Sequence, residues 1–138
     1  MVKILISLVM LFIITGCATQ KAYEGNKRNT NETSTISPLS PSLFRFGHPP
    51  LAIREVDGIK LNILKSGAFE TLPGKHTVFI LMPSSPSAGH HSARLIKMTF
   101  NTEAGKKYII DYKNKNSSKI VYFVVEENSG KVIYEMEN

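Results

Sequence analysis

The chain has 138 residues, 42% of them hydrophobic, and 17 Lys and Arg against 11 Asp and Glu give it a net charge of +6. This length suffices for one folded domain and is short for two. The basic residues are scattered and form no run of about five or six, which excludes the charge pattern of a nucleic-acid-binding stripe.

Residues 1–17 have the three parts of an export signal. Lys3 provides a positive start, Ile4 to Ile14 is apolar except for Ser7, and Thr15-Gly16 places small residues beside a cleavage point. About 11 apolar residues at 1.5 Å each cover roughly 16 Å, against a hydrocarbon core of about 30 Å. The segment is therefore too short for a membrane-spanning helix.

The four residues Ile14-Thr15-Gly16-Cys17 resemble the lipobox of bacterial lipoproteins, and Cys17 is the only cysteine in the chain. The resemblance implies that residues 1–16 are removed and that Cys17 carries diacylglycerol and becomes the new N-terminus. An ordinary secretory signal with a chance cysteine is the alternative. Ala18, rather than Asp, follows the cysteine, which in lipoproteins of enteric bacteria favours the outer membrane. We expect an envelope protein that is anchored through the Cys17 acyl chains, faces the periplasm and lies in the outer rather than the inner membrane.

Residues 17–31 are predicted to form a lipidated N-terminus and a flexible tether. The segment is polar, has no apolar period and contains one aromatic residue, Tyr23. About 14 flexible residues have a root-mean-square reach of about 20 Å. Such a tether would let a domain that spans residues 32–138 stand off the bilayer.

That domain is predicted to consist of strands and turns. Residues 33–37 form a first strand, and residues 38–50, with four prolines, form a loop. Residues 51–56 and 59–63 alternate in polarity around Asp57-Gly58, which predicts a hairpin with a type I′ turn. Residues 66–71 form a single turn at most.

The second half of the chain continues the same pattern. Leu72-Pro73-Gly74 has turn chemistry, and the strand after it, residues 75–82, is apolar on both faces and is therefore expected in the centre of a sheet. Further strands are predicted at residues 92–100, 108–112, 120–125 and 132–134, with turns at residues 104–105, 114–118 and 128–130.

Seven or eight short strands without a helix after the signal predict an all-β fold. Two packed antiparallel sheets are the usual arrangement for such a chain, so we expect a small antiparallel β-sandwich, with a small barrel as the alternative. Val56-Asp57-Gly58 and Pro73-Gly74-Lys75-His76-Thr77-Val78 also resemble the PEGA-type β-sandwich modules of bacterial envelope lipoproteins, although the quartet that names that group is absent. This resemblance implies the fold and no activity.

The four histidines do not predict a metal site. His90 and His91 are adjacent, so on a strand they would point to opposite faces, and zinc usually takes three or four protein ligands. His76 lies within a predicted strand and is expected to be a half-buried packing residue. We expect no metal and no cofactor.

The loop from Pro83 to His91 is the candidate partner-binding segment. Ser84, Ser85, Ser87 and His90 are residue types of a hydrolase, but no Gly-x-Ser-x-Gly elbow and no evident acidic partner accompany them, so no enzyme is predicted. Long loops on rigid scaffolds commonly carry binding residues. We therefore expect Ser84, Ser85, Ser87, His90 and His91 to contact a partner.

These observations predict a non-enzymatic module, structural or protein-binding, that docks an unidentified envelope protein. An uncovered sheet edge would suit this role, because it can accept a strand from a partner. A module that binds glycan or another cell-wall ligand is the alternative. The chain has no Trp with which to build the flat aromatic platform common in sugar sites.

Overall fold

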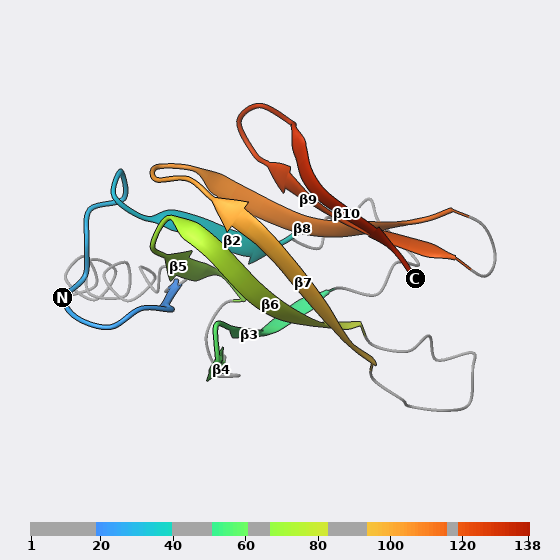
Figure 1. Cartoon of the computed structure of the whole chain (residues 1–138), viewed down its shortest axis with the longest axis horizontal. Helices are drawn as coiled ribbons and strands as arrows, with labels where there is room; N and C mark the ends of the chain where they lie inside the picture. Colours follow the sequence, from blue (N-terminus) through green and yellow to red (C-terminus); the bar gives the residue numbers. More distant parts are fainter. Residues whose placement is uncertain (1–18, 40–50, 61–66, 83–93, 116–118) are drawn as a thin grey trace, which may run out of the picture.

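The computed structural model describes residues 19–39, 51–60, 67–82, 94–115 and 119–138. These residues contain no helix and form two β-sheets of six and four strands (Figure 1). The all-β fold with two sheets is confirmed. Neither sheet closes on itself, so the barrel alternative is wrong.

The larger sheet has the strand order β1-β5-β2-β8-β9-β10. Its strands are β1 (Gln20–Lys21), β5 (Phe69–Thr71), β2 (Ser34–Pro38), β8 (Lys107–Asn114), β9 (Ile120–Glu126) and β10 (Val132–Glu137). The pairs β1–β5 and β2–β8 are parallel and the other three are antiparallel. The prediction of a wholly antiparallel sandwich is therefore wrong for these two pairs. Parallel neighbours need a long connection, and the strands of the smaller sheet lie between β2 and β8 in the chain.

The smaller sheet has the order β4-β3-β6-β7 and is antiparallel throughout. Its strands are β3 (Ala52–Val56), β4 (Ile59–Lys60), β6 (Gly74–Met82) and β7 (Arg94–Thr102). The turn between β3 and β4 has φ of 52° at Asp57 and 85° at Gly58, as a type I′ turn requires. The prediction of β6 as a central strand is confirmed, since it pairs with β3 on one side and β7 on the other.

Alternate residues of both sheets point into one shared core. In β6 and β7 these include Val78, Ile80, Ile96, Met98 and Phe100, all buried, and residues between them are more exposed. The larger sheet contributes Ile36, Phe69, Tyr108, Ile110, Tyr112, Tyr122 and Val124 to the same core. The period of two in the sequence therefore corresponds to burial on one face.

The N-terminal segment differs from the predicted flexible tether. Gln20–Lys21 form β1 at the edge of the larger sheet, and Ala22 and Tyr23 are buried. β5, which is buried throughout, lies where only a turn was predicted. Both strands are too short to show a periodic pattern, and their partners lie far away in the sequence.

Ion pairs link side chains at the strand ends. Lys106 Nζ lies 2.8 Å from Glu103 Oε2 and 3.2 Å from Oε2 of the buried Glu126, and these hydrogen bonds raise the pKa of Lys106 above its ordinary value. Hydrogen bonds from Lys115 and Lys119 lower the pKa of Glu137 to about 2. No helix in the described part of the chain is long and apolar enough to cross a membrane.

Candidate functional site

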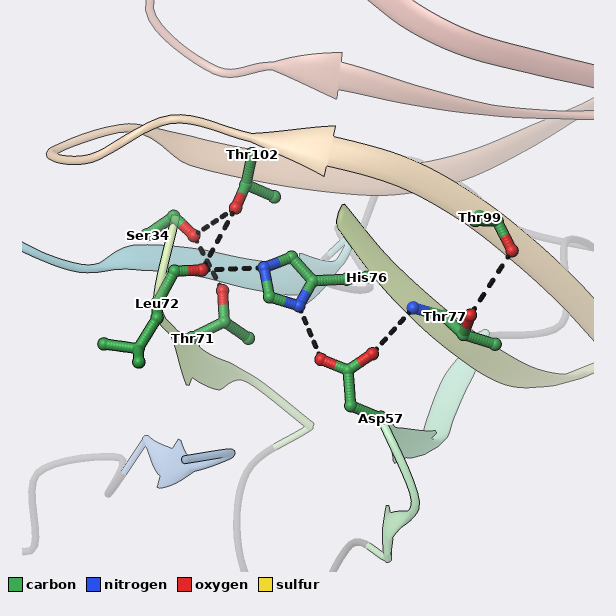
Figure 2. Close-up of polar contacts among 8 residues, drawn as sticks. All are labelled: Ser34, Asp57, Thr71, Leu72, His76, Thr77, Thr99 and Thr102. Carbon is green, nitrogen blue, oxygen red and sulfur yellow. Dashed lines mark hydrogen bonds and ion pairs between the residues drawn. The ribbon is translucent and has the colours of Figure 1, made fainter. Parts of the chain in front are cut away.

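A cluster of hydrogen-bonded polar groups surrounds Asp57 and His76 (Figure 2). Asp57 lies in the β3–β4 turn, and its Oδ2 is 2.6 Å from His76 Nδ1. The other ring nitrogen, Nε2, is 2.7 Å from the carbonyl oxygen of Leu72. The second carboxylate oxygen of Asp57 accepts a hydrogen bond of 2.8 Å from the Thr77 amide. The cluster thus connects the hairpin turn to the start of β6.

Three hydroxyl groups extend this cluster into the larger sheet. Ser34 of β2 donates to Thr102 of β7 at 2.8 Å. A serine hydroxyl has one proton, so Thr71 of β5 is the donor in its 2.7 Å contact with Ser34. All three residues are buried. Thr102 also lies 3.5 Å from the Leu72 carbonyl, a long contact. The network therefore joins both sheets at one end of the core.

The contacts of this cluster have a structural rather than a catalytic geometry. His76 is only 6% exposed, and each of its ring nitrogens lies within hydrogen-bond distance of an oxygen atom, one from Asp57 and one from Leu72. A general base needs a free ring nitrogen directed at a nucleophile, and Nε2 is directed at a backbone carbonyl instead. The Ser34 hydroxyl contacts two threonines. The expected packing role of His76 is thus combined with a polar role that the sequence did not indicate.

The residues predicted to be functional from the sequence lie outside the described residues. These are Cys17, Ser84, Ser85, Ser87, His90 and His91. β6 and β7, which flank the predicted partner-binding loop, pair in register over their full length, from Gly74 opposite Thr102 to Met82 opposite Arg94. Within the described segments, no three His, Cys, Asp or Glu side chains lie together as they would to hold a metal ion.

Tyr23 fastens the N-terminal segment to the larger sheet. Its hydroxyl donates to Glu70 Oε1 and accepts a 3.1 Å hydrogen bond from the Arg28 amide. Burial raises the pKa of Tyr23 above its ordinary value, and the hydrogen bond to Glu70 raises it further. Two backbone hydrogen bonds reinforce this contact. The Gln20 amide donates to the Ala68 carbonyl, just before β5, at 2.9 Å, and the Ala22 amide donates to the Glu70 carbonyl at 2.8 Å. A lone aromatic residue in a polar segment was the one sequence signal for this contact.

Residues 24–32, which follow Tyr23, form an exposed loop. An open hollow in its surface is lined by Lys27, Arg28, Asn29, Thr30 and Asn31. Lys27 and Arg28 form no ion pair with another described residue, whereas Lys21 bonds to the Gly25 carbonyl and lies 5.0 Å from the Tyr23 ring centroid. Two adjacent cations are thus available at this surface.

Among the described residues, the large apolar side chains that are most exposed belong to two edge strands. Leu95 of β7 is 60% exposed and Val132 of β10 is 48% exposed, and each strand has one hydrogen-bonded neighbour in the described chain. Leu95 pairs with Leu81, which pairs on its other side with Ala52, and both of these are partly exposed. An apolar row therefore crosses the outward face of the smaller sheet and ends at an open edge.

Comparison with known proteins finds no significant match to this chain. No family model matches the chain, no curated protein is significantly similar to it, and no solved structure matches it.

Proposed function

We propose that this protein is a bacterial envelope lipoprotein, anchored through acyl chains on Cys17, whose β-domain is a non-enzymatic module that binds another envelope protein. The observation that carries the proposal is the lipobox-like Ile14-Thr15-Gly16-Cys17 at the end of an export signal, with the only cysteine of the chain at the modified position. One acyl chain gives marginal binding to a membrane, and two give stable anchoring.

The edge of β7 supports the protein-binding part of the proposal. An open edge offers unpaired backbone groups to an extended segment of a partner, and side chains beside it provide specificity. Leu95 would be covered by an apolar side chain of the partner, and the exposed Arg94 and Lys97 favour acidic side chains next to it. The partner expected here is an extended, acidic and partly apolar segment of an envelope protein.

The tyrosines give less support to the glycan-binding alternative. Tyr23, Tyr108, Tyr112 and Tyr122 are buried, and Tyr134 is partly buried with its ring centroid 6.2 Å from that of Phe100. Sugar platforms require exposed, flat aromatic faces, and these rings are used in packing instead.

The anchor is tested by replacing the modified residue. Cells that express the full chain or its Cys17→Ser variant are fed a clickable fatty acid, and the N-terminus of each product is determined by mass spectrometry. The proposal requires a labelled product that begins at Cys17, and a variant that is neither labelled nor cleaved at this position. A product without acyl chains, or a variant still cleaved and labelled, would contradict it.

The interaction is tested by photo-cross-linking in intact cells. A photoreactive amino acid replaces Leu95, and the control carries it at Lys113, an exposed residue of the other sheet. We expect one protein adduct from the Leu95 position only, and loss of co-purification of that protein in the Leu95→Glu and Lys97→Glu variants. Adducts with glycan instead of protein would support the alternative, and identical adducts from both positions would remove β7 as the binding edge.

A further inference from the structure

The position of β1 limits how far the domain can stand from a lipid anchor. Gln20, the first residue of β1, lies three residues after Cys17 in the sequence. Three fully extended residues span about 10 Å at most. A tether that is free as far as residue 31 would reach about 20 Å. Because the Gln20 and Ala22 amides bond to the sheet and Tyr23 is buried, only the shorter connection is available.

We infer that the N-terminal end of the β-domain, formed by β1 and residues 24–32, lies directly against the headgroups of the bilayer in which Cys17 is anchored. This inference rests on the proposed lipidation of Cys17. A connection of about 10 Å at most brings β1 close to the headgroup layer. The occupant of this surface is therefore the anchoring membrane.

The charges of this end fit an anionic lipid surface. Residues 20–32 contain three basic side chains, Lys21, Lys27 and Arg28, and two acidic ones, Glu24 and Glu32. Lys27 and Arg28 are adjacent, exposed and without an ion pair in the described chain, so both can bind lipid phosphate. Lys60 is also exposed, and its carbonyl accepts a 2.9 Å bond from the Gln20 side chain, which places it next to β1.

This orientation directs the proposed binding edge away from the membrane. In Figure 1 the segment after β1 lies at one end of the long axis, and the start of β7 and the C-terminus lie toward the other end. Leu95 is the second residue of β7. Contact of the N-terminal end with lipid would therefore leave the exposed part of β7 free to meet a partner in the periplasm.

The experiment measures the depth of single fluorophores in vesicles that contain the lipidated full-length protein. Thr30→Cys and Asn138→Cys variants carry the environment-sensitive dye NBD at the exposed end of the hollow and at the C-terminus. The vesicles contain phosphatidylethanolamine and phosphatidylglycerol. Mass spectrometry first confirms two things, that Cys17 is acylated and that the dye is on the introduced cysteine.

We expect NBD at Thr30 to be quenched several-fold more by a headgroup-labelled nitroxide lipid, and less by aqueous iodide, than NBD at Asn138. A Gly-Ser insertion of about ten residues after Ala18, which adds a span of about 18 Å, should remove most of this difference. Lys27→Glu together with Arg28→Glu should reduce it in the same vesicles, whereas Lys97→Glu on β7 should not.

The outcomes separate the two proposals. Acylated protein with equal quenching at both positions would overturn the membrane-contact inference and leave the lipoprotein proposal standing. Absence of acylation would overturn both. An insertion without effect would show that the short connection does not hold the domain at the surface, and an ineffective charge reversal would remove Lys27 and Arg28 as lipid contacts.

Discussion

The contact between Asp57 and His76 predicts a measurable share of the stability of the domain. His76→Ala removes the hydrogen bonds of the ring with Asp57 Oδ2 at 2.6 Å and with the Leu72 carbonyl at 2.7 Å. A hydrogen bond to a carboxylate contributes about 2 kcal/mol and one to a carbonyl about 1 kcal/mol. Because the Asp57 side chain is 36% exposed, water replaces part of the first bond. We therefore expect a loss of about 2 to 3 kcal/mol, a large fraction of the ~5–15 kcal/mol of a typical domain.

Two replacements at Asp57 separate the contribution of its turn conformation to stability from that of its side-chain hydrogen bonds. Asn tolerates the left-handed φ of 52°, can still accept from the Thr77 amide, and can donate to His76 Nδ1 while Nε2 donates to Leu72. Asp57→Asn should therefore cost less than about 1 kcal/mol. Asp57→Ala loses these bonds and adds roughly 1 kcal/mol of backbone strain, so it should cost about 2 to 3 kcal/mol.

Urea unfolding followed by circular dichroism measures these differences. A double-mutant cycle of Asp57→Ala and His76→Ala should give a coupling of about 1 to 2 kcal/mol. Thr99→Ala is the matched control, because its hydroxyl makes only a 3.5 Å contact with Thr77, and it should stay within about 0.5 kcal/mol of the wild type. If His76→Ala were as mild as Thr99→Ala, or the coupling were zero, the reasoning would be refuted.

Three further predictions concern the charged and phenolic contacts. Tyr23→Phe should accelerate hydrogen exchange of the β1 amides and not of the β9 amides. Since burial raises the pKa of Tyr23, the contribution of its hydroxyl to the stability of β1 is complete below about pH 10 and is lost as the pH rises through the raised pKa. Wild-type β1 should therefore exchange faster above the raised pKa than below it. Lys106→Met should lower the urea midpoint more than Lys107→Met, because Lys106 pairs with the buried Glu126 and Lys107 with an exposed glutamate at 3.8 Å. The pKa of Glu137 is lowered to about 2, so the contribution of its ion pairs to stability is present above about pH 4 and is lost as the pH falls toward 2. The stability of Glu137→Gln should therefore depend less on pH between about pH 4 and 2 than that of the wild type. An unchanged acid unfolding profile would contradict this prediction.

The strands with enough residues to repeat a pattern could be predicted from the sequence. Each of the eight expected strands overlaps an observed one, and Asp57-Gly58 gave the position and type of a turn. β1 and β5 could not be predicted, because two or three residues do not establish a period of two. Their stability comes from pairing with each other and with β2, which is a tertiary contact and is absent from local sequence.

The contacts within the polar cluster could not be predicted from the sequence for a similar reason. Its side chains come from five separate positions on β2, β5, β6, β7 and the β3–β4 turn. Local sequence marks Asp57 as a turn residue and His76 as a strand residue, and each description is right. Only the approach of the turn to the start of β6 makes them partners. Lipidation of Cys17 and the role of the loop from Pro83 to His91 stay predictions.

Tyr23 determines which of two tether lengths a lipid anchor at Cys17 would have. While the Tyr23 hydroxyl and the Gln20 and Ala22 amides are bonded, the free connection is about 10 Å. If β1 detached, the chain would be free as far as the buried Thr33, and the reach would rise to about 20 Å. β1 has two residues and one neighbouring strand, whereas β8 lies between β2 and β9, so β1 is expected to open first. The segment that resembles a flexible tether in sequence is therefore held to β5 by two backbone hydrogen bonds and by the buried Tyr23 phenol. Tyr23→Phe removes only the phenolic bonds, so it should make β1 detach more often without unfolding the core.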